Sequence, residues 1–189
     1  MRALGRLLAW LLVVAALAVV ADWTWHQPFM VKPRTLWELS RMPPPVALAM
    51  PVAGVRAARV ADTFGAPRGA DRTHAGVDIF APRGTAVASA TRGIVSSVRE
   101  SGLGGRQVWV LGPARQRHYY AHLDDWAEGI EVGSVVLPGT PLGTVGDTGN
   151  ARGTPPHLHY GVYRADGAYD PLPLLLAAAA RLEQPGATR

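Results

Sequence analysis

The amino-acid sequence predicts a mainly β fold, a small antiparallel β-sheet assembly with a short C-terminal helix. The chain has 189 residues, of which 21 are Gly and 16 are Pro, and these two residue types mark frequent turns. From residue 55 onward, short apolar segments alternate with such turns. No long amphipathic helical pattern separates these segments, which favours an antiparallel sheet over a parallel α/β arrangement.

Residues 1–25 predict either a signal peptide or an N-terminal membrane anchor. Two arginines precede an apolar run over 7–21, and two tryptophans follow it. Small residues permit cleavage after Ala18 or Ala21, whereas the tryptophans suit the outer interface of a span that is retained. Both interpretations carry the rest of the chain across a membrane.

Residues 26–55 are predicted to form a proline-rich linker. Three prolines follow Met42, and Pro51 comes shortly afterwards. Because proline fixes φ and lacks a backbone donor, we expect no regular helix or sheet in this segment. The linker would hold the folded domain away from the membrane.

The domain itself is predicted to span 56–182, with 183–189 as a tail. Its expected strands cover residues 55–60, 86–90, 94–99, 107–111, 118–122, 134–137, 141–145 and 158–163. Glycine-rich segments at 101–105 and 146–150 are expected to be turns. Asp170 can cap the terminal helix, with Pro171 in its first turn and apolar residues over 174–182.

Charge and cysteine content exclude several classes of function. The net charge of +5 makes nucleic acid or an anionic envelope polymer a conceivable partner. Much of this excess precedes the domain, whose arginines are scattered and accompanied by no nucleic-acid motif, so we expect no nucleic-acid partner. The absence of cysteine excludes disulfides, thiol nucleophiles, cysteine metal ligands and a lipidated cysteine. A metal site would therefore use His and carboxylate.

Two histidines, His157 and His159, lie two residues apart in a predicted strand. Alternate residues of a strand project from one face, about 6.6 Å apart. His122 ends another predicted strand, so three imidazoles can meet at one metal ion and its water. The spacing does not decide whether His157 or His159 is the ligand. We interpret His26 and His118 as structural.

A second segment places His74 four residues before Asp78. In a straight strand the two would be about 13 Å apart, too far for both to bind one ion at about 2 Å. The chain must therefore bend between them, and Gly76 permits this. Together with the other histidines, this segment predicts a His/Asp metal site, and the sequence contains no His-Glu-x-x-His, Gly-x-Ser-x-Gly or phosphate-loop motif.

Ordered motifs accompany these residues. They comprise Phe64-Gly65 with Arg68, the segments 74–79, 81–85, 93–95, 120–123 and 143–149, and finally 157–160. In these motifs, over about residues 60–176, the sequence resembles the LytM/lysostaphin-type zinc endopeptidases, which cut peptide bridges in bacterial peptidoglycan. The resemblance implies an antiparallel β assembly with an open groove over the metal.

The resemblance also implies roles for the site residues. One zinc ion (Zn2+) would be held by His74, Asp78 and His159. His122 and His157 would act on the attacking water and the developing oxyanion, with the general base left unassigned. Some members carry a tyrosine shortly before the first zinc histidine, and residues 65–73 contain none.

The implied function is zinc-dependent hydrolysis of peptide cross-links by a metal-activated water. The partners would be peptidoglycan stem peptides and, if the N-terminal segment is uncleaved, the membrane. We expect a monomer in the cell envelope, exported across the inner membrane and periplasmic, membrane-anchored or secreted. Lysostaphin-like members cut glycine bridges, whereas Gram-negative relatives cut cross-links between D-alanine and diaminopimelate. Export without a lipidated cysteine and a compact single domain favour the second substrate for this chain.

Two alternative functions stay open. Some LytM-like domains have lost metal ligands and activate cell-wall amidases by binding them. The complete set of ligands and accessory histidines here favours an enzyme over such an adaptor. Zinc D-Ala-D-Ala carboxypeptidases use a similar ligand set but usually place the aspartate farther from the first histidine.

Overall fold

A computed structural model describes residues 2–68 and 72–182. Its helices are α1 (Arg2–Trp25), α2 (Val31–Arg41) and α3 (Leu172–Leu182). Its strands are β1 (Val77–Phe80), β2 (Ala86–Ala88), β3 (Gly93–Ser101), β4 (Gly105–Leu111), β5 (Arg117–Trp126), β6 (Val135–Val136), β7 (Pro141–Val145), β8 (His157–Arg164) and β9 (Gly167–Tyr169). The predicted tail at 183–189 lies outside the described residues.

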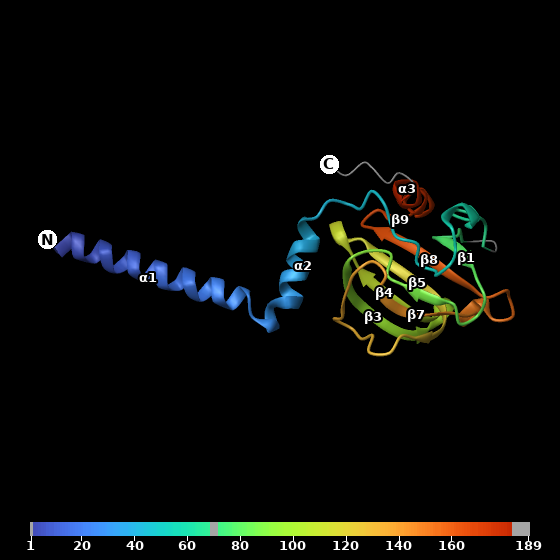
Figure 1. Cartoon of the computed structure of the whole chain (residues 1–189), viewed down its shortest axis with the longest axis horizontal. Coiled ribbons are helices and arrows are strands. Elements are labelled where there is room, and N and C mark those ends of the chain that lie inside the picture. The colour runs from blue at the N-terminus through green and yellow to red at the C-terminus, as the bar shows by residue number, and fades with distance from the viewer. Residues whose placement is uncertain (1, 69–71, 183–189) are drawn as a thin grey trace.

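Within this part of the chain, the strands form one antiparallel sheet. The order β1-β8-β5-β4-β3-β6 makes its main path, while β7 pairs with β2 and β5, and β9 pairs with β8. Helix α1 extends away from the sheet, with α2 between them (Figure 1). The predicted mainly β, antiparallel fold with a C-terminal helix is confirmed.

Most predicted elements have a counterpart in the sheet. The strand expected at 55–60 is wrong, because residues Ala57–Arg59 form a 3-10 helix, of which Ala57 reaches the core. Strands β1 and β9 were not predicted, since each is short and β1 contains an aspartate. Asp170 caps α3 as expected, with its Oδ1 accepting from the Leu172 N–H at 2.9 Å.

The prediction of an irregular linker over 26–55 is wrong for residues 28–41. Helix α2 lies within this segment, and its proline falls in the first turn, where proline is tolerated. Leu39 in α2, and Leu48 and Val52 beyond it, are almost fully buried. The prolines at 43–45 and 51 follow α2, and residues 42–55 form no helix or strand, as expected there. Burial of these apolar side chains shows that the packed part of the chain begins before residue 56.

The central strands divide the domain into a core face and a groove face. Side chains alternate between the two faces along each strand. The core face carries fully buried residues of β4, β5 and β8, namely Val108, Val110, Tyr120, Leu158, Tyr160 and Val162. The groove face carries half-buried Trp109, Tyr119 and His159. The sheet thus places the histidines of the predicted metal site opposite its most tightly packed side chains.

His118 lies on the core face, away from the groove, which agrees with its interpretation as a structural residue. Its side chain is fully buried, and its Nδ1 is 2.8 Å from the Tyr160 hydroxyl. Among the described residues, its Nε2 has no hydrogen-bond partner. Burial disfavours the charged imidazolium and lowers the pKa of His118 to about 3.

This burial predicts how stability depends on pH. Between the ordinary histidine pKa of 6.5 and about 3, the unfolded chain binds a proton that the folded chain does not. The stabilising effect is therefore present above pH 6.5 and is lost as the pH falls below it. Going from about pH 7 to about pH 5, the unsubstituted protein should lose about 2 kcal/mol more unfolding free energy than His118→Asn. Urea unfolding of both proteins in detergent measures this, and equal losses would contradict it.

Candidate metal centre

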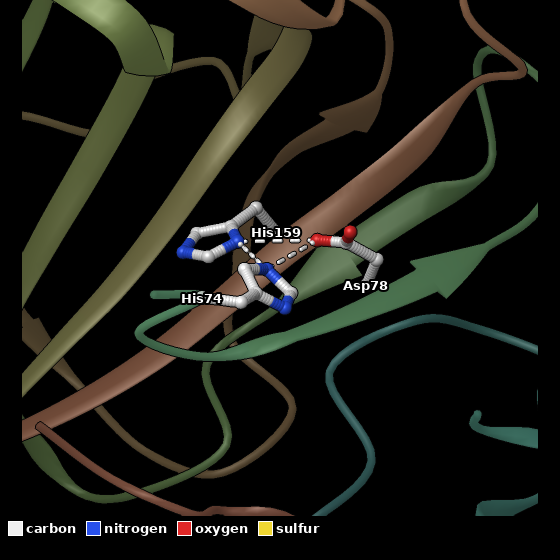
Figure 2. A group of neighbouring side chains, drawn as sticks. All are labelled: His74, Asp78 and His159. Carbon is white, nitrogen blue, oxygen red and sulfur yellow. Dashed lines mark hydrogen bonds and ion pairs between the residues drawn. The ribbon is translucent and has the colours of Figure 1, made fainter. Parts of the chain in front are cut away.

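The pairing of β1 with β8 brings a carboxylate and an imidazole together. Asp78 is directly opposite His159 in the antiparallel register, so both side chains project from the same face. His74 precedes β1 and points into the same place (Figure 2). His74 Nε2 lies 3.0 Å from Asp78 Oδ1, His159 Nδ1 lies 3.1 Å from the same oxygen, and the two nitrogens are 2.8 Å apart. These three atoms can serve together as metal ligands.

The chain bends at Gly76 between His74 and Asp78, as the spacing predicted. The structure adds a second reason for glycine at this position. A Cβ atom on Gly76 would collide with the backbone carbonyl of Tyr160 in β8. Because glycine has no side chain, the segment before β1 can approach β8 closely enough for His74 to reach Asp78.

A backbone carbonyl fixes the orientation of His74. The Nδ1 of this ring is 2.7 Å from the carbonyl oxygen of Thr63, which can only accept a hydrogen bond. The proton therefore resides on Nδ1, and the lone pair on Nε2 faces Asp78 and His159. An oriented tautomer of this kind is the usual arrangement behind a metal-binding imidazole.

Asp78 is buried but held in its ionised form. Burial alone raises the pKa of this carboxyl, but the close polar contacts with His159, His74 and Arg68 lower it well below its usual range. Arg68 pairs with Oδ2, which leaves Oδ1 directed at the two imidazoles. Sequence reasoning noted Arg68 only as part of a motif, since nothing in its spacing linked it to Asp78.

His122 and His157 flank this cluster. Their ring centroids are 5.1 Å apart, and His157 Nε2 lies 3.9 Å from Asp78 Oδ1. Both side chains donate from Nδ1 to a backbone carbonyl at 2.8 Å, that of Thr148 for His122 and that of Pro155 for His157. Each Nε2 is therefore left as a proton acceptor. Burial lowers the pKa of His122 to about 4, so this ring is neutral near pH 7.

The loop containing Thr148 holds His122 in an unusual backbone conformation. His122 has a φ of 64°, one of three positive values among the described non-glycine residues, and such a conformation costs about 1–3 kcal/mol. The Thr148 hydroxyl donates to the Leu123 carbonyl and accepts from the Arg106 N–H, both at 2.9 Å. Sequence reasoning treated 146–150 only as a turn and missed this role of Thr148.

Arg83 anchors the same loop. Its guanidinium pairs with Asp124, two residues after His122, and with Asp147 at 2.6 Å, one residue before Thr148. These ion pairs are substantially exposed, so their main effect is geometric: one guanidinium links β5 to the loop that contains Thr148.

A groove of about 590 Å³ lies over the histidines and Asp78. Arg72, Leu103 and Thr154 contribute to its walls, together with two tyrosines, Tyr119 and Tyr163. The Tyr119 ring meets the His159 ring edge-on at 5.7 Å and stacks on Trp109 at 4.2 Å. The groove therefore offers aromatic and cationic surface beside the cluster of metal-binding groups.

Comparison with known sequences decides the family. The sequence profile of Peptidase family M23 matches residues 72–171, which is more than half of the chain. The chain belongs to this family. Its predicted resemblance to LytM/lysostaphin-type peptidases is thus confirmed.

Individual M23 relatives and structures agree with this assignment. The L-Ala--D-Glu endopeptidase of Bacillus subtilis (strain 168) is 39% identical over 126 residues, covering 61% of this chain and 39% of that protein. The catalytic domain of the antimicrobial peptidase lysostaphin from Staphylococcus simulans matches with a TM-score of 0.56 and 30% identity, covering 62% of this chain and 92% of that one. A zinc-containing peptidase from Vibrio cholerae matches with a TM-score of 0.57 and 28% identity, covering 67% and 39% of the two chains. This M23 chain spans less than half the length of the curated relatives it matches.

The geometry predicts which histidine of the pair in β8 is needed for metal binding. Loss of one ligand from a site with a binding free energy of order 10 kcal/mol should weaken zinc affinity at least about 100-fold. His159→Ala should therefore lose zinc, whereas His157→Ala should keep it. Zinc content and competition with a fluorescent chelator measure this, and equal zinc loss in both variants would overturn the assignment.

Arg68 is expected to act on the metal through Asp78. Arg68→Ala should weaken zinc affinity about 10- to 100-fold, as removal of an outer-shell partner typically does. Arg72→Ala is the matched control, because Arg72 also lines the groove but makes no ion pair with Asp78 among the described residues. Similar zinc affinities for the two variants would show that the pair with Asp78 does not tune the site.

Proposed function

We propose that the chain is a zinc-dependent endopeptidase that hydrolyses peptide bonds of bacterial peptidoglycan in the cell envelope. One observation carries the proposal. Two imidazole Nε2 atoms, on His122 and His157, face the groove beside a complete set of three groups that could bind a metal. Membership of Peptidase family M23, and relatives named as an endopeptidase and as a zinc-containing peptidase, support it.

The donor atoms suit zinc. Two ligands at about 2.0 Å from a tetrahedral zinc ion are about 3.3 Å apart, and the separations of 2.8–3.1 Å here are close to this value. Two imidazole nitrogens and one carboxylate oxygen also match the ligand types of catalytic zinc sites, which keep one position open. A bound zinc ion would supply a Lewis acid that acidifies water and polarises a carbonyl.

The chain's own residues then handle the proton. A water in the groove can give its proton to Nε2 of His122 or His157, since the Nδ1 proton of each ring is held by a carbonyl. Once protonated, the same ring can donate to the oxyanion or to the leaving amine. The carbonyls of Thr148 and Pro155 keep both rings in position through this exchange.

The groove suits an extended, carboxylate-bearing peptide. Arg72 offers a guanidinium that can pair with a carboxylate, and Tyr119 offers a half-buried aromatic surface. Stem peptides of peptidoglycan present both backbone and free carboxylates. An L-Ala–D-Glu bond, which the name of the Bacillus subtilis relative specifies, places a carboxylate next to the bond that is cut.

The test uses full-length protein in detergent, supplied with zinc, and purified sacculi from Gram-negative and Gram-positive cells. Chelation should abolish release of muropeptides, and loss of a general base should lower turnover by about 10²- to 10⁴-fold in His122→Ala or His157→Ala. His118→Asn, which changes a histidine outside the groove, should retain turnover. Mass spectrometry distinguishes cleavage at L-Ala–D-Glu, at cross-links or at a terminal D-alanine.

Two outcomes would count against the peptidase. Unchanged sacculi of both kinds would contradict it directly. Stimulation of a purified cell-wall amidase by zinc-free protein would indicate an adaptor instead.

A further inference from the structure

Helix α1 has the properties of a membrane span. Residues Ala3–Trp25 form a 23-residue helical segment near the N-terminus that is apolar enough to cross a membrane, and none of its most apolar stretch is buried in the described structure. At 1.5 Å per residue this helix is about 34 Å long, enough for a hydrocarbon layer of about 30 Å. Figure 1 shows it directed away from the sheet.

Helix α2 is attached directly to the outer end of α1. Five residues separate the two helices. Arg34 Nη1 donates to the carbonyl of Trp25, the last residue of α1, at 3.0 Å. The Trp25 and Trp37 rings meet edge-on at 5.6 Å. If α1 crosses a bilayer, α2 must therefore lie at its outer boundary.

The inner face of α2 is fixed to the domain. Thr35 and Leu39, one helical turn apart, are buried. Glu38 pairs with Arg92, which immediately precedes β3. Because α2 contacts both α1 and the sheet, it joins them as a packed element rather than as a flexible linker.

The outer face of α2 is apolar and basic. Leu36 and Trp37 are 43% and 49% exposed, and Phe29, just before the helix, is 67% exposed. Arg41 lies over the Trp37 ring at 4.6 Å. A hollow of about 340 Å³ between α2 and the β4–β5 turn adds Arg115 beside Leu36 and Trp37. Exposed aromatic residues with arginines are typical of a membrane interface.

We propose that this surface, the interfacial face formed by Phe29, Leu36, Trp37 and Arg41, binds the outer surface of the anionic phospholipid bilayer that α1 crosses. The apolar side chains enter the boundary between headgroups and acyl chains, and the arginine pairs with lipid phosphate. Continuity with α1 selects a bilayer over a protein partner. The proposal does not depend on peptidase activity.

The interfacial face determines where the groove points. Helix α2 packs against the 3-10 turn Pro113–Arg115, which joins β4 to β5. His122 lies toward the other end of β5, five residues beyond Arg117, or about 17 Å along the strand. His159, opposite Ala121, lies at the same level. The histidines therefore lie on the groove face, displaced along the strands away from α2 and the bilayer.

A chain without cysteine allows single-site labelling. Leu36→Cys and the control Leu103→Cys, a residue 54% exposed beside the groove, carry the same fluorophore in the full chain. Each is reconstituted into vesicles of phosphatidylglycerol and phosphatidylethanolamine. Lipids with a quencher near the headgroup should remove at least about half of the fluorescence at position 36, because an interfacial face sits about 5–10 Å deep. Position 103 should lose little and should be quenched by aqueous iodide.

A second substitution and a change of lipid test the same contact independently. Adding Trp37→Glu to Leu36→Cys should reverse the pattern at position 36, with circular dichroism showing an intact fold. Replacing phosphatidylglycerol by phosphatidylcholine should weaken lipid quenching, since the arginine then meets no net anionic surface. Equal quenching of positions 36 and 103 would overturn the proposal. So would envelope-derived protein whose mass shows cleavage after Ala18 or Ala21.

Discussion

The register between β1 and β8 is the constraint on which the candidate metal centre depends. Val77 and Ile79 on β1 lie opposite Tyr160 and Leu158 on β8, and all four are almost fully buried. Asp78 alternates with the first two and so projects into the groove. A slip of one residue would turn every side chain of β1 to the other face. Since burying each large apolar side chain contributes about 1.5–3 kcal/mol, the core fixes the position of the ligands.

Backbone carbonyls fix the orientation of the three histidine rings His74, His122 and His157. The three carbonyl oxygens that accept from Nδ1 belong to Thr63, Thr148 and Pro155, which lie in loops rather than in strands. They set the tautomers of the rings before any metal or substrate arrives. Holding the His122 ring in this position requires a strained backbone at His122. The ion pairs of Arg83 with Asp124 and Asp147 stabilise the chain on both sides of the contact between His122 and Thr148.

Helices α1 and α2 determine how the groove is oriented relative to the proposed bilayer. Helix α2 contacts the end of α1 on one side and the sheet on the other, through Leu39 and through the pair of Glu38 with Arg92. If the interfacial face binds the bilayer as proposed, the bilayer lies near the β4–β5 turn and the histidines lie farther along the strands. A cell-wall polymer outside the membrane would then face the groove without passing between the domain and the lipid.

The sequence by itself determined the fold class, most strands, the cap of α3 and the bend at Gly76, because turns, alternation and capping are local properties of the chain. Chemistry limited the metal-binding groups to His and carboxylate, and family resemblance alone chose between His157 and His159. Strand β1, helix α2 and the parts played by Arg68 and Thr148 came only from tertiary structure. Each depends on partners distant in sequence, such as Thr148 for His122, 26 residues away. These contacts between distant residues form only when the whole core is buried, so no local sequence pattern predicts them.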